Sequence, residues 1–265
     1  MENSNYVRIS VCIATYNGKP YIKEQIYSIL EQLTENDEII ISDDGSTDGT
    51  VEFIKSINDD RIIILPHEKV KNPWRNIGGD FKCFGVSSNF GNALKYARGQ
   101  YIFLSDQDDI WVKDRISIIL GHLQHKIKCC VICNYALMDK NGIIYKEKCR
   151  PNKTKFKIIK SVINPPFMGC LLAFDRSFYN HIYPFPKRIP SHDLWIGIYA
   201  LLNKCLIVED KPLHLYRTYG INVSSNIHNS LLFKIVYRIY IIVLVIYRTL
   251  INTLKIKKCK SVKIY

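Results

Sequence analysis

Apolar and polar positions change period repeatedly along the first half of the chain. Continuous apolar runs rich in β-branched residues predict four strands, at residues 7–14, 38–41, 61–65 and 101–104. The segments between them favour helices, first from the helical spacing of Ile22, Ile26 and Ile29, and then from shorter patterns at 51–57 and 92–98. Strands that alternate with helices predict an α/β fold with a Rossmann-like, mostly parallel central sheet flanked by helices.

Polar residues gather where three of these strands end. They are Thr15, Tyr16 and Asn17 after the first strand, Asp43 and Asp44 after the second, and Asp106, Asp108 and Asp109 after the fourth. Ligands of open parallel sheets bind beyond the carboxyl ends of the strands. We therefore expect these side chains to meet at one edge of the sheet and to form a ligand site there.

Three carboxylates lie within four residues directly after an apolar strand. A positive charge beside them would stabilise them. Ionised carboxylates resist leaving water and repel one another, so such a group holds a metal or faces a wet cleft. Mg²⁺ and Mn²⁺ are the expected cations, because both prefer carboxylate oxygen and Mg²⁺ commonly bridges carboxylates and substrate phosphates. The alternative is a solvated acidic turn that caps the following helix.

Four segments, in this order and spacing, resemble family 2 glycosyltransferases of the GT-A fold. They are A-T-Y-N-G at 14–18, S-D-D-G-S-T-D at 42–48, S-D-Q-D-D-I-W at 105–111 and H-D-L-W at 192–195. With P-L-H-L-Y-R at 212–217 and G-I-N-V-S at 220–224, the chain looks most like the bacterial rhamnosyltransferase-type branch. The resemblance covers roughly residues 7 to 226. It implies an inverting, divalent-metal-dependent enzyme that moves a sugar from a nucleotide diphosphate onto an acceptor hydroxyl.

The resemblance also assigns roles to the strand-end residues. Thr15, Tyr16 and Asn17 match the loop that meets the nucleotide. Asp43 or Asp44 matches the acid that accepts a hydrogen bond from the imide N–H of uracil or thymine, a donor that suits a carboxylate. Asp108 matches the direct metal ligand, and Asp106 lies nearer the ribose or the metal's water. The donor implied is a dTDP- or UDP-sugar.

The second half is expected to supply the general base, because inversion requires the acceptor to attack opposite the diphosphate. Asp193 is the candidate, at the start of an apolar segment, 194–202, that predicts a helix. The alternative is that Ser191 or Asp193 only caps that helix. The resemblance places further residues around the donor sugar and acceptor, namely Gly169, His192, Trp195 and Arg217. Tyr219 stands where the branch usually has a histidine, and a phenol is a poor magnesium ligand at neutral pH.

The net charge of +13 is concentrated at the end of the chain. Residues 211–265 contain no Asp or Glu and ten Lys or Arg, at 211, 217, 234, 238, 248, 255, 257, 258, 260 and 263. The apolar segment 231–250 predicts an amphipathic helix lying in an anionic membrane surface, and its uncharged core, Ile239–Tyr247, is too short to span a bilayer. The alternative is a helix packed on the catalytic domain or on a partner. We thus expect a GT-A catalytic domain at 1–226 and a basic C-terminal helix and tail at 227–265.

Other classes of protein fit the sequence less well. A sugar nucleotidyltransferase shares the sheet, acids and metal but normally has a glycine-rich basic loop after its first strand, and a binding-only, inactive homologue is a further alternative. Zinc at His122, His125, Cys129, Cys130 and Cys133 is disfavoured, because neighbouring strand residues point to opposite faces. No nucleic-acid-binding pattern or phosphate-binding glycine motif occurs.

The cellular setting follows from the cysteines and from the start of the chain. The nine cysteines form no paired framework and no signal peptide opens the chain, which favours a reducing cytoplasm. If the acceptor is a saccharide or a lipid-linked sugar of bacterial surface polysaccharide synthesis, the protein is expected to sit peripherally on the inner face of the cell membrane.

Overall fold

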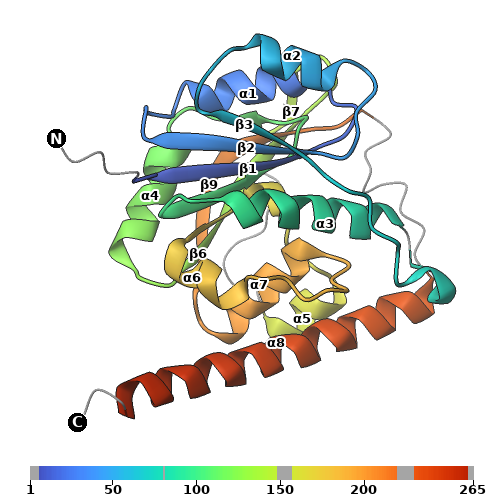
Figure 1. Cartoon of the computed structure of the whole chain (residues 1–265), viewed down its shortest axis with the longest axis vertical. Helices are drawn as coiled ribbons and strands as arrows, with labels where there is room; N and C mark the ends of the chain where they lie inside the picture. Colours follow the sequence, from blue (N-terminus) through green and yellow to red (C-terminus); the bar gives the residue numbers. More distant parts are fainter. Residues whose placement is uncertain (1–5, 80, 148–156, 220–229, 262–265) are drawn as a thin grey trace.

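The computed structural model describes residues 6–79, 81–147, 157–219 and 230–261 (Figure 1). Its first half alternates strands and helices: β1 (Ile9–Thr15), α1 (Ile22–Leu30), β2 (Asp37–Asp43), α2 (Thr50–Ser56), β3 (Ile62–Pro66), the 3₁₀ turn η1 (Arg75–Ile77), α3 (Phe81–Tyr96) and β4 (Tyr101–Ser105). The four strands pair in parallel in the spatial order β3-β2-β1-β4. The predicted α/β sheet is thereby confirmed for this half.

The second half extends the same sheet with mixed strand directions. Its elements are β5 (Ile110–Trp111), α4 (Arg115–His125), β6 (Cys130–Met138), β7 (Ile144–Lys146), α5 (Ile158–Ile163), η3 (Gly169–Leu171), β8 (Leu172–Asp175), α6 (Arg176–Ile182), α7 (His192–Leu202) and β9 (Leu206–Arg217). The nine-stranded sheet continues beyond β4 as β8-β6-β9-β5, and β7 pairs with β6. Strand β8 runs antiparallel to both β4 and β6. The sheet is therefore more mixed than the mostly parallel one expected.

Helix α3 is longer than its sequence pattern indicates. The helical period predicts a helix at 92–98, whereas α3 spans Phe81–Tyr96. Its first two turns contain glycine, serine and asparagine, which have low helix propensity and hide the period. Tertiary packing overrides that propensity, because Phe90, Ala93 and Leu94 are buried against the strands that α3 crosses in Figure 1.

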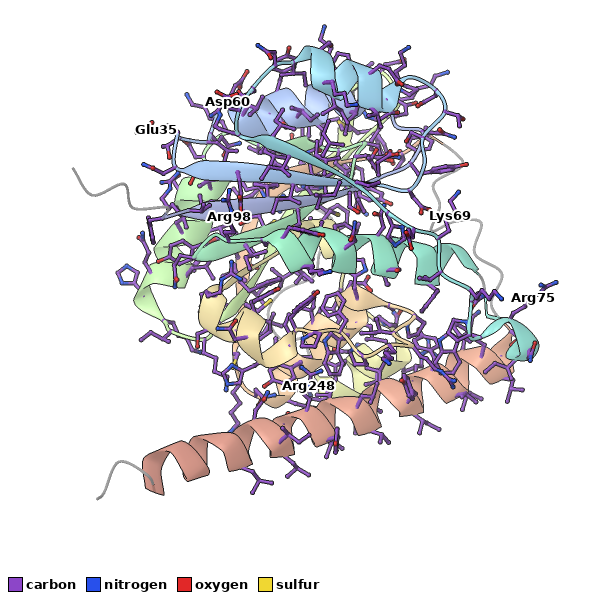
Figure 2. The ribbon with its side chains drawn as sticks, in the orientation of Figure 1. Glu35, Asp60, Lys69, Arg75, Arg98 and Arg248 are labelled. Atoms are coloured by element: carbon purple, nitrogen blue, oxygen red, sulfur yellow. The ribbon has the colours of Figure 1, made fainter. Side chains whose placement is uncertain are left out.

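The chain ends in a long helix, α8 (Leu231–Ser261), that lies along α6 and α7 on the outside of the domain (Figure 1). Figure 2 shows Arg248 on the side of α8 that faces the domain. Within the parts of the chain that the structure describes, no helix has a stretch both long and apolar enough to cross a membrane. The C-terminal helix is confirmed; the predicted domain boundary at 226/227 lies outside the described residues.

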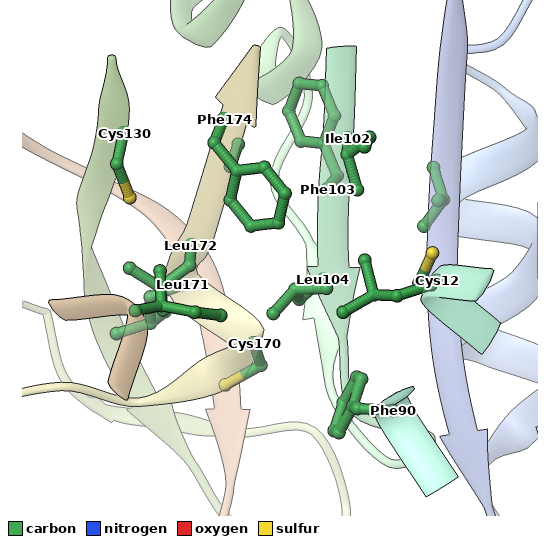
Figure 3. Close-up of a cluster of buried hydrophobic side chains, with 14 of the residues drawn as sticks. Cys12, Phe90, Ile102, Phe103, Leu104, Cys130, Cys170, Leu171, Leu172 and Phe174 are labelled. Carbon is green, nitrogen blue, oxygen red and sulfur yellow. The ribbon is translucent and has the colours of Figure 1, made fainter. Parts of the chain in front are cut away.

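A single hydrophobic core fills the space between the sheet and its helices. Figure 3 shows Leu104 of β4 between Cys12 of β1 and Leu172 of β8, with Phe90 of α3 nearby. These four side chains are completely buried. Because the core locks β1 and β4 side by side, the loops that follow them are held on a rigid base.

Candidate active site

The pairing register places the ends of three strands side by side. Thr15 of β1 lies opposite Asp43 of β2, and Ile13 of β1 lies opposite Ser105 of β4. Since the three strands are parallel, the polar residues that follow them leave the sheet at the same edge. This is the convergence that the sequence predicts from the order of strands and helices.

Hydrogen bonds tie the three strand-end loops to one another. The Gln107 side chain after β4 accepts from the Tyr16 backbone N–H at 2.9 Å and donates to the Tyr16 carbonyl at 3.1 Å. Asn17 accepts from the Thr47 N–H at 2.9 Å, and its own N–H donates to the Ser46 hydroxyl at 2.8 Å. Sequence reasoning missed Gln107, whose only signal is its place between Asp106 and Asp108.

Asp43 and Asp44 have different roles in the structure. The Asp43 carboxylate is buried and accepts from the backbone N–H groups of Gly45 and Ser46, at 3.0 and 2.8 Å. It therefore holds the turn after β2, at which Gly45 adopts a φ of +81° that favours glycine. Within the described part of the chain, Asp44 has a side-chain partner only at Oδ1, which contacts His67 Nδ1 at 2.8 Å, so its other oxygen is left there for a ligand.

Helix α3 supports the loops from behind through three consecutive polar residues. Ser87 contacts the backbone N–H of His192 at 2.9 Å, Ser88 contacts Nε2 of His67 at 3.0 Å, and Asn89 donates to the Thr15 carbonyl at 3.3 Å. One turn of helix thus connects three site segments that are far apart in the sequence. The sequence pattern predicts that this helix begins only at residue 92. It therefore does not indicate that these three polar residues belong to the site.

Asp106 and Asp108 are two neighbouring acids that directly follow β4. Burial raises the pKa of Asp108 to about 6, and the neighbouring Asp109 charge adds to this shift. Burial and the charges of Asp109 and Asp108 raise the pKa of Asp106 well above its usual range, and Asp193 contributes in the same direction. The Asp193 charge therefore lies within electrostatic reach of Asp106, which brings the predicted base toward the strand-end acids.

The raised pKa values of Asp106 and Asp108 fit a site for a divalent cation. Their carboxylates are penalised by burial and by neighbouring negative charge, and a bound dication would remove that penalty. Carboxylate oxygen is also the donor that Mg²⁺ and Mn²⁺ prefer. Asp106 and Asp108 are thus the residues of this chain that would hold such an ion.

A second group of ligand-type side chains lies deeper. Ligand atoms of Asp109, Cys170 and His214 lie within 4.8 Å of one another, the one such group found among the described residues. Both ring nitrogens of His214 already have protein partners, Asp109 Oδ2 at 2.7 Å and the Arg115 guanidinium at 2.5 Å. Because Arg115 can only donate, His214 Nδ1 must accept, and Nε2–H donates to Asp109. This cluster is a buried ion network beneath the site, and the sulfur-rich zinc set weighed in the sequence does not assemble in the described residues.

Tyr219 meets the metal-ligand candidate directly. Its hydroxyl donates to Asp108 Oδ2 at 2.5 Å, and its ring stacks on Tyr21 with centroids 5.3 Å apart. This hydrogen bond lowers the pKa of Asp108 and so opposes the effect of burial. Tyr219 is therefore a hydrogen-bond partner of Asp108, the candidate metal ligand. The neighbouring motif at 220–224 lies outside the described residues.

Replacing Tyr219 with Phe is expected to shift the pH dependence of metal binding upward. Without the phenol the Asp108 carboxylate loses a stabilising donor, so its pKa rises above 6 and protons compete with Mn²⁺ at higher pH. Titration of Mn²⁺ into ligand-free protein between pH 5 and 8 measures this. The wild type is expected to lose affinity below about pH 6, and an unchanged profile in Tyr219→Phe would contradict the assignment.

Asp193 stands in the first turn of α7. The Ser191 hydroxyl donates to Asp193 Oδ1, and the Leu194 backbone N–H donates to the same oxygen at 2.8 Å. Ser191 is also the N-cap of the helix, accepting from Leu194 N–H at 3.4 Å. Both bonds that the described residues make to the Asp193 carboxylate use Oδ1, so among them Oδ2 stays available to accept a proton.

His192 and Gly169 are in close contact. A methyl group at Gly169 would lie 2.4 Å from His192 Nε2, so only glycine fits at this position. The His192 ring packs at a tilt against Phe90, with centroids 4.4 Å apart, and burial lowers its pKa. The His192 Nε2 atom is buried without a hydrogen-bond partner in the described residues. The two residues lie together, and their place around the donor sugar and acceptor stays a prediction.

Trp195 and Arg217 lie elsewhere than the resemblance implies. Trp195 is fully buried in the core, where its indole N–H donates to the Ile182 carbonyl at 3.2 Å. Arg217 is also buried; it donates to the Asp108 carbonyl at 2.9 Å and pairs with Glu24. Arg217 therefore supports the acidic loop through its backbone. The expected direct contacts of both residues with sugar or phosphate do not fit their burial.

Comparison with known proteins agrees with this geometry. The sequence matches the family described as Glycosyl transferase family 2 over residues 10–77 and 82–183, more than half of the chain. It is 30% identical over 222 residues to the UDP-Glc:alpha-D-GlcNAc-diphosphoundecaprenol beta-1,3-glucosyltransferase WfaP of Escherichia coli, covering 82% of this chain and 80% of that protein. It is also 30% identical over 235 residues to the dTDP-rhamnosyl transferase RfbG of Shigella flexneri, covering 81% and 74%.

Solved structures show the same fold at low sequence identity. TarS of S. aureus in complex with UDP-GlcNAc superposes with a TM-score of 0.62 at 17% identity, over 84% of this chain and 62% of that one. The mannosyltransferase PcManGT of Pyrobaculum calidifontis, in complex with GDP-Man and Mn²⁺, gives 0.54 at 18%, over 82% and 58%. This chain thus spans less than two thirds of either solved chain. The family match and the 30% identical relatives show that the chain belongs to glycosyl transferase family 2, and the fold agrees with this.

Proposed function

We propose that this protein is an inverting, metal-dependent glycosyltransferase that moves a sugar, with rhamnose and glucose as first candidates, from a dTDP- or UDP-linked donor. The observation that carries the proposal is the joining of the loops after β1, β2 and β4, with the residue before Asp193 tied to the same turn of α3 that supports them. Gln107 ties the β4 loop to Tyr16, and His192 N–H donates to Ser87 at 2.9 Å. The transfer of glucose by WfaP and of rhamnose by RfbG, as their names state, supports the choice of donors.

The base of the donor is read by Asp44. Its free oxygen suits the imide N–H of uracil or thymine, which cytosine lacks, and His67 fixes the carboxylate by bonding the other oxygen at 2.8 Å. Ser88 completes the support by contacting the far side of the His67 ring at 3.0 Å. Thr15, Tyr16 and Asn17 lie on the adjoining loop and line the nucleotide. Asp43 contributes by keeping the turn in shape.

Transfer follows by direct displacement at the anomeric carbon. The acceptor oxygen bonds to that carbon while the bond from carbon to the diphosphate oxygen breaks, and the diphosphate leaves with the electron pair. The acceptor proton passes to Asp193 Oδ2, because the described residues bond only Oδ1 of this carboxylate. Asp106 and Asp108 would hold a divalent cation, which would supply positive charge beside the departing diphosphate. Gly169 and His192 shape the sugar side of the site.

The acceptor is a hydroxyl of a saccharide, free or carried on a lipid diphosphate, in surface polysaccharide synthesis. The name of WfaP specifies a sugar linked to diphosphoundecaprenol, which supports a carrier lipid as the acceptor's anchor. An enzyme that meets cytoplasmic nucleotide sugars and a lipid carrier works at the cytoplasmic face of the membrane. We therefore place the protein there as a peripheral protein.

A donor screen tests the proposal. Thermal stabilisation of the protein by dTDP-rhamnose, UDP-glucose, UDP-galactose and UDP-GlcNAc is measured with Mn²⁺, with Mg²⁺ and with a chelator. At least one donor is expected to raise the melting temperature only when metal is present. Stabilisation by none of them, or equal stabilisation in chelator, would contradict the proposal.

Replacing Asp44 with Asn is expected to weaken UDP and dTDP binding about 10- to 100-fold, the loss typical of a hydrogen bond to a charged group. Asp43→Asn is the matched comparison, and it is expected to lower the melting temperature because it loosens the turn at Gly45 and Ser46. Calorimetric titration and thermal melts separate the two effects. Unchanged nucleotide affinity in Asp44→Asn would remove its assigned role.

A further inference from the structure

Helix α8 has a fixed orientation on the domain. Val245 and Ile241 are almost completely buried on its inner side. Arg248 donates to the Pro184 carbonyl at 2.8 Å and lies over the Trp195 ring at 5.6 Å. Asn252 donates to the His181 carbonyl at 3.1 Å. These contacts prevent the helix from rolling, so the side that faces away from the domain is always the same one.

The side of α8 that faces away from the domain is apolar along its length. We call it the outer stripe, and it consists of Ile235, Ile239, Val243, Ile246, Leu250 and Leu254, each 48–64% exposed. At 100° per residue these positions fall within an arc of about 100°, and at 1.5 Å per residue they extend for about 30 Å. Monomeric proteins rarely expose a continuous apolar surface of this size unless something covers it.

The charge around the stripe indicates what covers it. Residues 211–265 carry ten Lys or Arg and no acid, and five of the lysines follow the stripe, at 255, 257, 258, 260 and 263. The same segment of a second copy of the chain would offer apolar side chains but no acid to pair with these lysines. An anionic lipid surface satisfies both features, since it accepts the apolar side chains and attracts the lysines.

We propose that the outer stripe of α8 and the lysines after it form the surface on which the protein binds an anionic membrane, with the helix lying in the interfacial plane. This inference rests on the proposed peripheral location and names the surface that produces it. Three other residues of α8 do not belong to this surface, because Arg248 bonds the domain, Tyr237 packs against the hydrophobic core and Tyr240 packs on Trp74.

The start of α8 also contacts the segment that leads to the donor loops. Trp74 packs edge-on against Phe233 and Tyr240, at 5.8 and 5.2 Å, and the Ser230 N–H donates to the Gly78 carbonyl at 3.1 Å. The chain from Gly78 back to His67 reaches the partner of Asp44. One stretch of chain therefore connects the start of α8 to the donor loops.

Flotation of the full chain with vesicles tests this surface. Neutral phosphatidylcholine vesicles are compared with vesicles that contain 30% phosphatidylglycerol. The wild type is expected to float with the anionic vesicles and weakly with the neutral ones. The triple variant Ile239→Ser, Val243→Ser, Leu250→Ser is expected to lose at least about 10-fold in partition, because it removes three apolar side chains that would be buried among the lipids.

A matched control removes equally exposed apolar side chains elsewhere. Ile127→Ser, Ile143→Ser, Ile159→Ser alters three residues that are 63–85% exposed and lie off α8, and its flotation is expected to equal that of the wild type. Equal loss in both triple variants, or no flotation of the wild type, would overturn the inference. So would a stable dimer in vesicle-free buffer that the α8 triple variant abolishes, because a second copy would then cover the stripe.

Metal-dependent donor binding distinguishes this inference from the proposed function. The α8 triple variant is expected to keep the wild-type melting temperature and the wild-type response to donor and Mn²⁺. If no donor binds but flotation follows the pattern above, the proposed function fails and the surface stands. If donors bind but flotation fails, the reverse holds.

Discussion

Replacing Asp193 with Asn is expected to reduce kcat about 1,000-fold or more while donor and metal affinities stay within a few-fold of wild type. General base catalysis typically contributes a factor of about 100 to 10,000, and an amide cannot take the acceptor proton. The asparagine carbonyl still accepts from Ser191 and from the Leu194 N–H, so the start of α7 is preserved. The measurement is single-turnover transfer together with calorimetric donor titration.

Ser191→Ala is the control for this variant. It removes the N-cap of α7 and is expected to cost about 1 kcal/mol of stability with only a few-fold change in turnover. If Asp193 acted only in capping, the two variants would behave alike. Turnover of Asp193→Asn within 10-fold of wild type would contradict its role as the base.

Replacing Asp108 with Asn is expected to weaken metal-dependent donor binding at least about 100-fold and, at the same time, to stabilise the metal-free fold. The first effect follows from the loss of a charged ligand and the second from relief of a buried charge. An acid whose folded pKa is raised to about 6 destabilises the fold above that pH. The gain in melting temperature is therefore expected at pH 7.5 in chelator and should shrink near pH 5, where Asp108 is already protonated in the folded state.

Asp109→Asn provides a contrast one residue away. Asp109 accepts from His214 at 2.7 Å and from the Arg217 N–H at 2.9 Å inside the ion network, where Arg115 is also buried. Breaking such a buried network typically costs about 3–5 kcal/mol, so this variant is expected to lower the melting temperature. Loss of stability in Asp108→Asn as well would contradict the distinction between ligand and support.

The sequence is sufficient to predict the part of the site that lies on strand ends. Apolar runs followed by polar residues predict where β1, β2 and β4 stop, and parallel pairing then places Thr15, Asp43 and Ser105 at one edge. Local pattern and topology are enough here because each strand is a separate signal. The same reasoning predicts a helix that begins near Asp193, and α7 begins there, at His192.

The missing part of the site depends on contacts between distant residues. Ser88 reaches His67 and Asn89 reaches Thr15 only because α3 begins far earlier than its period indicates. Trp195 and Arg217 share types and spacing with ligand-binding residues, and only their burial distinguishes them from such residues. Likewise, hydropathy predicts that α8 is amphipathic but cannot tell which side the domain covers.

The most direct test of the central claim is a transfer assay with the full chain. The protein is incubated with each candidate nucleotide sugar, Mg²⁺ or Mn²⁺, and a GlcNAc linked to a polyprenyl diphosphate, and the products are identified by mass spectrometry and NMR. We expect metal-dependent release of UDP or dTDP, matched by a new glycosidic bond of inverted anomeric configuration. A product that retains the donor configuration, or transfer that persists in chelator or in Asp193→Asn, would contradict the account.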